Sequence, residues 1–385
     1  MYRLGHALFD DIDLKLKVGG VTPDIQNRII SVRRKAALSA WLEETVAHSV
    51  DISLKSNPSV NPAFMLLTGN QVEKACEAAM DAGNPKLATL ISQAGGDFEF
   101  RKDLKEQLEI WRDERVDVHI DEEIRKIYAL LAGVSDVIEG SKGSGLEKCK
   151  DVDIFEGLDW KRAFGVHLWF VQPLDASIAQ VFESYDQQRR ESAERIAGPR
   201  TWYSEYPPHT SNLIRVWNLP PTTSTPDALF SMIKLHADPT CSLSDILCPL
   251  SFGPSPLDYS ISWHLYVILS RCMRVRDFSD RGDAGVQSQS QENEDDGGGV
   301  EGHSPSADLL ASMYALQLEK MELLQEAVFV LLHIEGSLGC VFFFCISVNK
   351  IIHACLTGEK RQSRTYWQGK RRNLTIGRCA GSVGA

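Results

Sequence analysis

The chain has 385 residues, of which 43% are hydrophobic and 24% charged, and its formal net charge is −11. This composition excludes fibrous and intrinsically disordered proteins, and the acidic balance argues against direct binding of nucleic acid. The nine cysteines lie far apart without zinc-ligand spacing, so we expect reduced thiols, buried in the case of Cys76 and Cys272.

The first clear helical signal follows the dipeptide Thr22–Pro23, after an N-terminus that lacks the basic-then-apolar pattern of a secretory signal. From Ile25 to Val46 apolar residues recur at spacings of three and four, which predicts one long amphipathic helix. Residues 56–62 are polar and marked by proline, so we expect a loop there.

Residues 61–116 predict four short helices in succession, each opened by an Asn or Asp that suits a helix start. The predicted starting residues are Asn61, Asn70, Asn84 and Asp97. Glycine closes the first three helices, because it tolerates the left-handed turn after a helix end. These glycines are Gly69, Gly83 and Gly95–Gly96. Links this short fold neighbouring helices back on one another.

The rest of the chain continues in the same style. The further predicted helices span approximately residues 121–133, 159–171, 175–195, 225–233, 261–273 and 305–331. Residues 133–157 predict a glycine-rich connection, 198–224 an irregular crossing and 280–304 a flexible acidic loop. No alternating pattern competes with helix before residue 337, so the predicted fold class is all-α, an irregular stack without a sequence repeat.

Residues 337–385 differ in character. The apolar run LGCVFFFCISVNKIIHACL (338–356) precedes a basic segment, which leaves two interpretations open: a membrane anchor, or a tail foreign to the fold, such as a translated intron or shifted frame. Asn349, Lys350 and His353 interrupt the run and leave about eleven apolar residues where a span needs about 20. We therefore expect no membrane insertion and interpret the tail as an atypical segment that is foreign to the fold.

No motif predicts catalysis. The EGSKGSG segment (139–145) lacks the spacing of a phosphate-binding loop and follows a helix, so we interpret it as a linker. His167 and His264 lie in apolar helices without a nucleophile nearby in sequence, which favours core or interface histidines. We therefore expect no catalytic residue, cofactor, metal ion or small-molecule substrate. A helical hydrolase would instead need a nucleophile and a base on loops between helices.

Five segments resemble the nucleoporin ninety-six family, with a fungal character. They keep the family's order and cover most of residues 1–336. The segments are LLTGNQVEKACEAAMDAGNPKLATLISQAGGD (66–97), EQLEIWRDERVDVHI (106–120), DIFEGLDWKRAFGVHLWF (153–170), SFGPSPLDYSISWHLYVILSRCMRVRDFSDRG (251–282) and AVFVLLHIEG (327–336).

The resemblance implies an irregular α-helical solenoid that folds back on itself and has no enzymatic activity. The implied solenoid consists of residues 1–279 and a continuation at residues 305–336, with the acidic loop between them. Family members are C-terminal products of a self-cleaving precursor and serve as scaffold subunits of the Y-shaped complex of the nuclear pore. A vesicle-coat scaffold of the same fold and a membrane-anchored helical protein are the alternatives.

The resemblance also implies partners. These are other helical nucleoporins and a β-propeller, although the N-terminal segment that docks the propeller is not found in this sequence. Residues 61–135 match the fold-back region, which in the family meets a second helical nucleoporin. The candidate interface residues there are Leu87, Leu90, Phe98 and Phe100.

Overall fold

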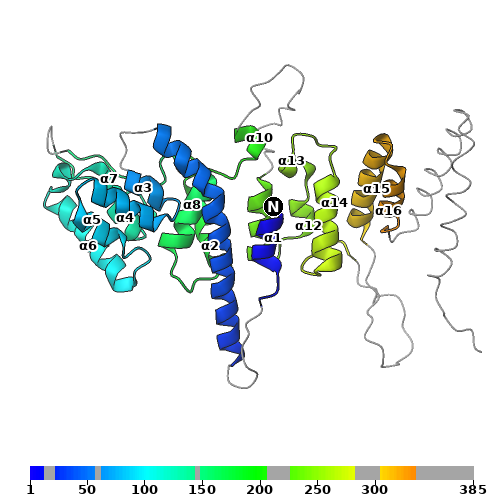
Figure 1. Cartoon of the computed structure of the whole chain (residues 1–385), viewed down its shortest axis with the longest axis horizontal. Helices are drawn as coiled ribbons and strands as arrows, with labels where there is room; N and C mark the ends of the chain where they lie inside the picture. Colours follow the sequence, from blue (N-terminus) through cyan, green and yellow to red (C-terminus); the bar gives the residue numbers. More distant parts are fainter. Residues whose placement is uncertain (13–21, 57–61, 144–147, 206–225, 282–303, 335–385) are drawn as a thin grey trace, which may run out of the picture. The chain divides into compact units, whose positions relative to one another are not determined.

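In the computed structural model, the part of the chain that is described is all-α (Figure 1). It comprises residues 1–12, 22–56, 62–143, 148–205, 226–281 and 304–334. Within these ranges β pairing is limited to an isolated antiparallel bridge between Ile138 and Val152. None of the helices in these ranges has both the length and the apolar character needed to cross a bilayer.

The α-helices are α1 (Tyr2–Phe9), α2 (Pro23–Ser56), α3 (Pro62–Leu67), α4 (Val72–Asp81), α5 (Pro85–Ile91), α6 (Phe98–Asp113), α7 (Glu122–Leu131), α8 (Trp160–Val166), α9 (Ile178–Glu191), α10 (Trp202–Glu205), α11 (Ala228–Ala237), α12 (Leu243–Ile246), α13 (Pro249–Phe252), α14 (Ser260–Tyr266), α15 (Pro305–Lys320) and α16 (Leu324–Leu331). The segment η1 (Asp117–His119) is a 3-10 turn, whereas η3 (His167–Val171) and η5 (Val267–Cys272) are π-helical.

The fold divides into two compact units, Met1–Pro254 and Ser255–Ala385, with the boundary between α13 and α14. The sequence predicts no boundary at this position. The predicted division into residues 1–279, 280–304 and 305–336 stays a prediction, as does the solenoid arrangement. The atypical tail at 337–385 lies outside the described residues.

The longest helix, α2, begins at Pro23, where the sequence predicted it. Its inward stripe consists of Leu38, Leu42, Val46 and Val50, spaced by one turn of helix. Helices α1, α3 and α8 pack against α2, and α1 also packs on α11. The long helix α2 therefore contacts helices from both the beginning and the later part of the first unit.

The starts of two short helices follow the cap chemistry expected from the sequence. The side chain of Asn84 accepts a 3.1 Å hydrogen bond from the backbone N–H of Leu87 at the start of α5. Asp97 accepts a 3.0 Å hydrogen bond from the N–H of Phe100 at the start of α6. The predicted starting residue Asn61 lies outside the described residues.

Asn70, by contrast, does not cap α4, and that prediction was wrong. Its backbone is left-handed, with φ of 57°, and its N–H and that of Gln71 bond back to carbonyls near the end of α3. Gly69, the predicted helix end, is not left-handed. A Cβ on Gly69 would lie 2.8 Å from the side chain of Val50. Gly69 therefore permits the close approach of α3 to α2, and Asn70 makes the turn.

The chain reverses after α6, because α7 packs on both α3 and η3, and α8 then returns to α2. Two basic side chains donate hydrogen bonds to carbonyls at the end of η3 and just after it. Arg101 of α6 donates a 3.2 Å hydrogen bond to the carbonyl of Val171, and Lys35 of α2 donates one of 2.7 Å to the carbonyl of Pro173. Burial, together with the charge of Arg101, lowers the pKa of Lys35 to about 8.

Aromatic rings from α8, α9 and α11 fill the centre of the first unit. The ring of Trp160 meets that of Phe230 edge-on at 5.9 Å, and the ring of Phe164 meets that of Tyr185 at 5.7 Å. The hydroxyl of Tyr185 donates a 2.8 Å hydrogen bond to the carbonyl of Ala197, so the polar end of this buried ring is satisfied.

In the second unit, α14 packs on α15, and α15 and α16 pack together. The rings of Trp263 and Tyr314 lie 5.3 Å apart at this contact. Residues 261–273 are apolar nearly all round, a pattern that predicts a helix buried between other helices, yet Ile261, His264 and Cys272 are exposed. The predictions of a buried Cys272 and of an all-round buried helix were therefore wrong, because α15 covers only one side of α14.

The two ends of the predicted acidic loop meet at the start of α15. The hydroxyl of Ser304 accepts a 3.2 Å hydrogen bond from the N–H of Ala307 and donates one of 2.7 Å to Asp280. The rest of the loop, residues 282–303, lies outside the described residues.

Candidate interaction surfaces

The four residues predicted for a partner interface lie on α5 and α6, and they differ in exposure. Leu87 is 5% exposed and belongs to the interior of the helical stack. Leu90 and Phe100 are half-buried, whereas Phe98 is 74% exposed. Leu87 therefore has no surface to offer, and Phe98 is the member of the set that another protein can cover.

The position of Phe98 follows from the local sequence. It is the first residue of α6, directly after the cap Asp97. The buried residues of that helix, Leu104 and Leu108, lie further along it and form the inward stripe. Ile110 of α6 and Met80 at the end of α4 are also exposed. This stretch thus carries more apolar side chain than its own core uses.

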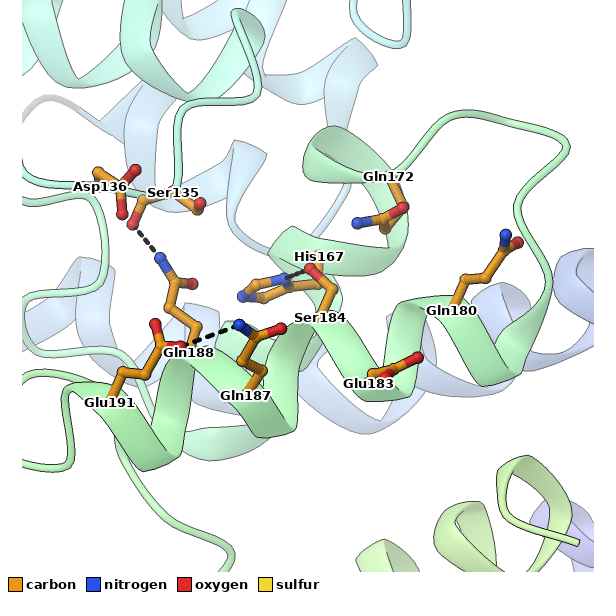
Figure 2. A pocket seen from close by; sticks show the side chains of 10 residues that line it. All are labelled: Ser135, Asp136, His167, Gln172, Gln180, Glu183, Ser184, Gln187, Gln188 and Glu191. Atoms are coloured by element: carbon orange, nitrogen blue, oxygen red, sulfur yellow. Dashed lines mark hydrogen bonds between the residues drawn. The ribbon is translucent and has the colours of Figure 1, made fainter.

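A polar pocket of about 410 Å³ lies beside α9 (Figure 2). Its ten lining residues are three carboxylates, four glutamines, two serines and one histidine, and none is a lysine or an arginine. The carboxylates are Asp136, Glu183 and Glu191. In the described part of the chain none of these three forms an ion pair, and Glu191 accepts a 2.9 Å hydrogen bond from Gln187.

His167 is one of the lining residues of this pocket and is 1% exposed. Its Nδ1 is 2.9 Å from the hydroxyl of Ser184, and its ring stacks on that of Phe155 with 5.5 Å between centroids. Burial lowers the pKa of His167 to about 4, with an opposing contribution from Gln188. The imidazole is therefore neutral at pH 7. His167 is therefore a core histidine, whereas His264 is exposed, and an interface role for His264 stays a prediction.

The sequence alone does not identify Ser184 or Gln188 as partners of His167. Both lie on α9, four residues apart, and Gln188 donates a 2.5 Å hydrogen bond to the carbonyl of Ser135. The only local signal was a pair of polar residues on the inward side of an amphipathic helix. Asp117, which accepts hydrogen bonds of 2.8 Å from the N–H and the hydroxyl of Ser141, was missed for the same reason.

The contact of Ser184 with His167 does not make a catalytic pair. The other side-chain neighbour of the imidazole is an amide, Gln188, where a nucleophilic site would place a carboxylate. A histidine with a pKa of about 4 is also a weak general base. Among the described residues no group of three or more His, Cys, Asp or Glu side chains is placed to hold a metal ion.

Comparison with known proteins identifies relatives of the chain. A family model described as Nup96, Nuclear protein 96, matches residues 61–355. The chain belongs to the Nup96 family. The match begins at the short helices α3 to α6 and extends beyond α16 into residues that lie outside the described part of the chain.

Curated relatives come from fungi, plants and animals. The chain is 30% identical over 306 residues to nucleoporin nup189 of Schizosaccharomyces pombe. This match covers 78% of the present chain and 15% of nup189. It is 29% identical over 271 residues to nuclear pore complex protein NUP96 of Arabidopsis thaliana, covering 68% of this chain and 24% of the relative. It is 26% identical over 304 residues to nuclear pore complex protein Nup98-Nup96 of Drosophila melanogaster, covering 78% and 13%. The chain thus spans a quarter or less of each of these relatives.

Proposed function

We propose that the chain is a structural scaffold component of the nuclear pore. It acts at the nuclear envelope without catalysis, and it supports pore assembly and nucleocytoplasmic transport by binding other helical nucleoporins of the Y-shaped complex. Membership of the Nup96 family supports this role, because the relatives are named as nucleoporins or nuclear pore complex proteins.

The structural observation that carries the proposal is the exposure of Phe98 at the start of α6. The side chain of Phe98 is 74% exposed. Aromatic side chains are enriched at the centres of protein interfaces, where covering them excludes water. The same stretch of the sequence, residues 87–100, also contains the half-buried Leu90 and Phe100, whereas Leu87 is buried. The stretch lies within residues 61–135, the segment that resembles the fold-back region.

A co-purification experiment tests the proposal. The chain is expressed with a tagged helical nucleoporin of the Y-shaped complex from the same organism, in the wild-type form and with Phe98→Glu or Leu90→Glu. Burying a carboxylate at the centre of an apolar interface is costly. We therefore expect each substitution to lower the amount of chain that co-purifies with the tagged nucleoporin by about tenfold or more.

The matched control is Leu174→Glu, because Leu174 is 77% exposed and lies between η3 and α9 on the same unit. This variant should co-purify like the wild type. Equal retention of all variants contradicts the assignment of the surface to α5 and α6. Failure of the wild-type chain to retain any helical nucleoporin contradicts the scaffold function itself.

A further inference from the structure

The outward side of α16 carries apolar side chains that no described part of the chain covers. The inward side of this helix consists of the buried residues Ala327, Val330 and Leu331, and α16 packs beside α15 (Figure 1). Phe329 is 57% exposed, and Leu332, the residue that follows the helix, is 65% exposed. These two residues lie three positions apart and therefore share one side of the helix.

This outward side is apolar and without charge. Within the described ranges eighteen large apolar side chains are exposed, and six of them lie in residues 304–334. The other positions on the outward side of α16 are Gln325 and Val328, neither of which is charged. The ring of Phe329 packs against that of His333 with 4.9 Å between centroids, so it is held in one place. A fixed, uncharged apolar surface is suited to cover by another apolar segment.

The chain itself supplies an apolar segment directly after this helix. The described part ends at Ile334, and the apolar run of residues 338–356 begins four residues later. Four residues span no more than about 14 Å, so the run starts close to Leu332. Gly336 lies in the link and permits the chain to reverse. A segment tethered this closely has a high effective concentration at the surface of α16, which a separate molecule lacks.

Two further observations support this run as the segment that covers α16. It contains three consecutive phenylalanines, at 342–344, which lose contact with water only when another surface covers them. The match to the Nup96 family model continues through residue 355, so it includes almost the whole run and stops before the basic segment. A membrane is a poorer occupant, because Asn349 and Lys350 interrupt the run before it reaches the length of a span.

We propose that residues 338–356 pack on the outward side of α16 and cover Phe329 and Leu332. The surface is thereby closed by a segment of the same chain, and Phe329 and Leu332 are not available to other nucleoporins. For residues 338–356 the proposal replaces the expectation of a segment foreign to the fold. It does not depend on the proposed function.

Hydrogen exchange of the whole chain, measured by mass spectrometry, tests the proposal. We expect the backbone amides of residues 338–356 to exchange at least about tenfold more slowly than those of the basic segment at 360–372. This protection should be the same at about 1 µM and about 50 µM protein, because the contact lies within one chain.

The variant Leu332→Glu separates packing on α16 from any structure that the run forms alone. A carboxylate on the covered surface should raise the exchange rate of residues 338–356 about tenfold. Peptides from α15 should keep their protection, because Leu332 lies outside the buried side of the helix pair. The matched control is Leu174→Glu, an exposed leucine of the first unit, which should leave exchange of the run unchanged.

Four outcomes would overturn the proposal. The first is rapid exchange of residues 338–356 in the wild type, and the second is equal exchange of this run in Leu332→Glu and Leu174→Glu. Protection that appears only at the higher protein concentration would assign the surface of α16 to a second copy of the chain. Flotation of the wild-type chain with vesicles of phosphatidylcholine and phosphatidylserine would assign the run to a membrane.

Discussion

The guanidinium of Arg162 donates two hydrogen bonds to the hydroxyl of Thr68, 3.1 Å from Nε and 2.7 Å from Nη2. Both residues are almost fully buried, and they join α8 to the turn that follows α3. A third hydrogen bond of 2.9 Å runs from Nη1 to the hydroxyl of Ser53 on α2. A charged side chain in the interior is thus satisfied mainly by hydroxyl groups, and the fold depends on those hydroxyls staying in place.

Replacing Thr68 with valine should therefore destabilise the first unit by about 2 kcal/mol, because it leaves two donors of a buried cation without an acceptor. Urea denaturation followed by circular dichroism measures the loss. Thr45→Val is the matched control, since the hydroxyl of Thr45 bonds only to the carbonyl of Trp41 within α2. That change should cost less than about 0.5 kcal/mol. Equal losses would mean that the Arg162 contacts contribute nothing specific.

The pH dependence of stability should reveal His167. Its pKa falls from 6.5 to about 4 on folding because burial disfavours the charged ring. Between these pH values the unfolded chain binds a proton that the folded chain does not, so stability falls as the pH is lowered from about 6.5 to 4. The full contribution is about 3 kcal/mol, present above pH 6.5.

Urea midpoints measured from pH 4.5 to 7 for the wild type and for His167→Gln check this expectation. In His167→Gln, the urea midpoint should change much less with pH over this range than it does in the wild type. His264→Gln is the control, because His264 is exposed and its replacement should leave the slope intact. An unchanged slope in His167→Gln would show that other groups cause the acid sensitivity.

Local chemistry explains which parts of this fold the sequence predicts well. The starts of α2, α5, α6 and α15 follow from a proline or a capping side chain within the first turn, so residues such as Asn84 and Ser304 reveal them directly. The all-α class follows from the same periodic patterns, and the structure confirms it. Family membership was predicted from the order of the matching segments and is confirmed as well.

The remaining features depend on contacts between residues that are distant in sequence. His167 meets Ser184 and Gln188 only because η3 packs on α9, and nothing in either segment alone announces that contact. The sequence also does not predict that Leu87 is buried whereas Phe98 is exposed. Helix α5 has only seven residues, too few for the spacing of apolar positions to define an inward face.

Two asparagines illustrate how similar sequence contexts differ in structure, and serine separates them experimentally. Asn84→Ser should leave stability nearly unchanged, because serine caps the start of α5 as well as asparagine does. Asn70→Ser should cost about 1 kcal/mol, since serine is poorly suited to the left-handed backbone at φ of 57°. The substitution also removes the 2.7 Å hydrogen bond from Asn70 to Glu43. Thermal unfolding of the two variants provides the comparison, and an equal loss in both would contradict the different roles.

The turn at Gly133 should be the least tolerant of the glycine turns in the first unit. Its φ is +67°, and a Cβ added there would lie 2.7 Å from the carbonyl oxygen of Phe170 at the end of η3. Gly133→Ala therefore combines an unfavourable backbone with a clash against main chain that Arg101 holds nearby. We expect a loss of about 3 kcal/mol in urea denaturation.

Gly83→Ala isolates the backbone contribution. Gly83 has a similar φ of +75°, and nothing lies within 4 Å of the position of its missing Cβ. This variant should lose only about 1 kcal/mol, the cost of a left-handed alanine. The difference between the two variants then measures how firmly the end of η3 is fixed against the turn after α7. If both lose the same amount, the carbonyl of Phe170 moves aside freely, and the packing of α7 on η3 is too loose to hold the chain reversal in place.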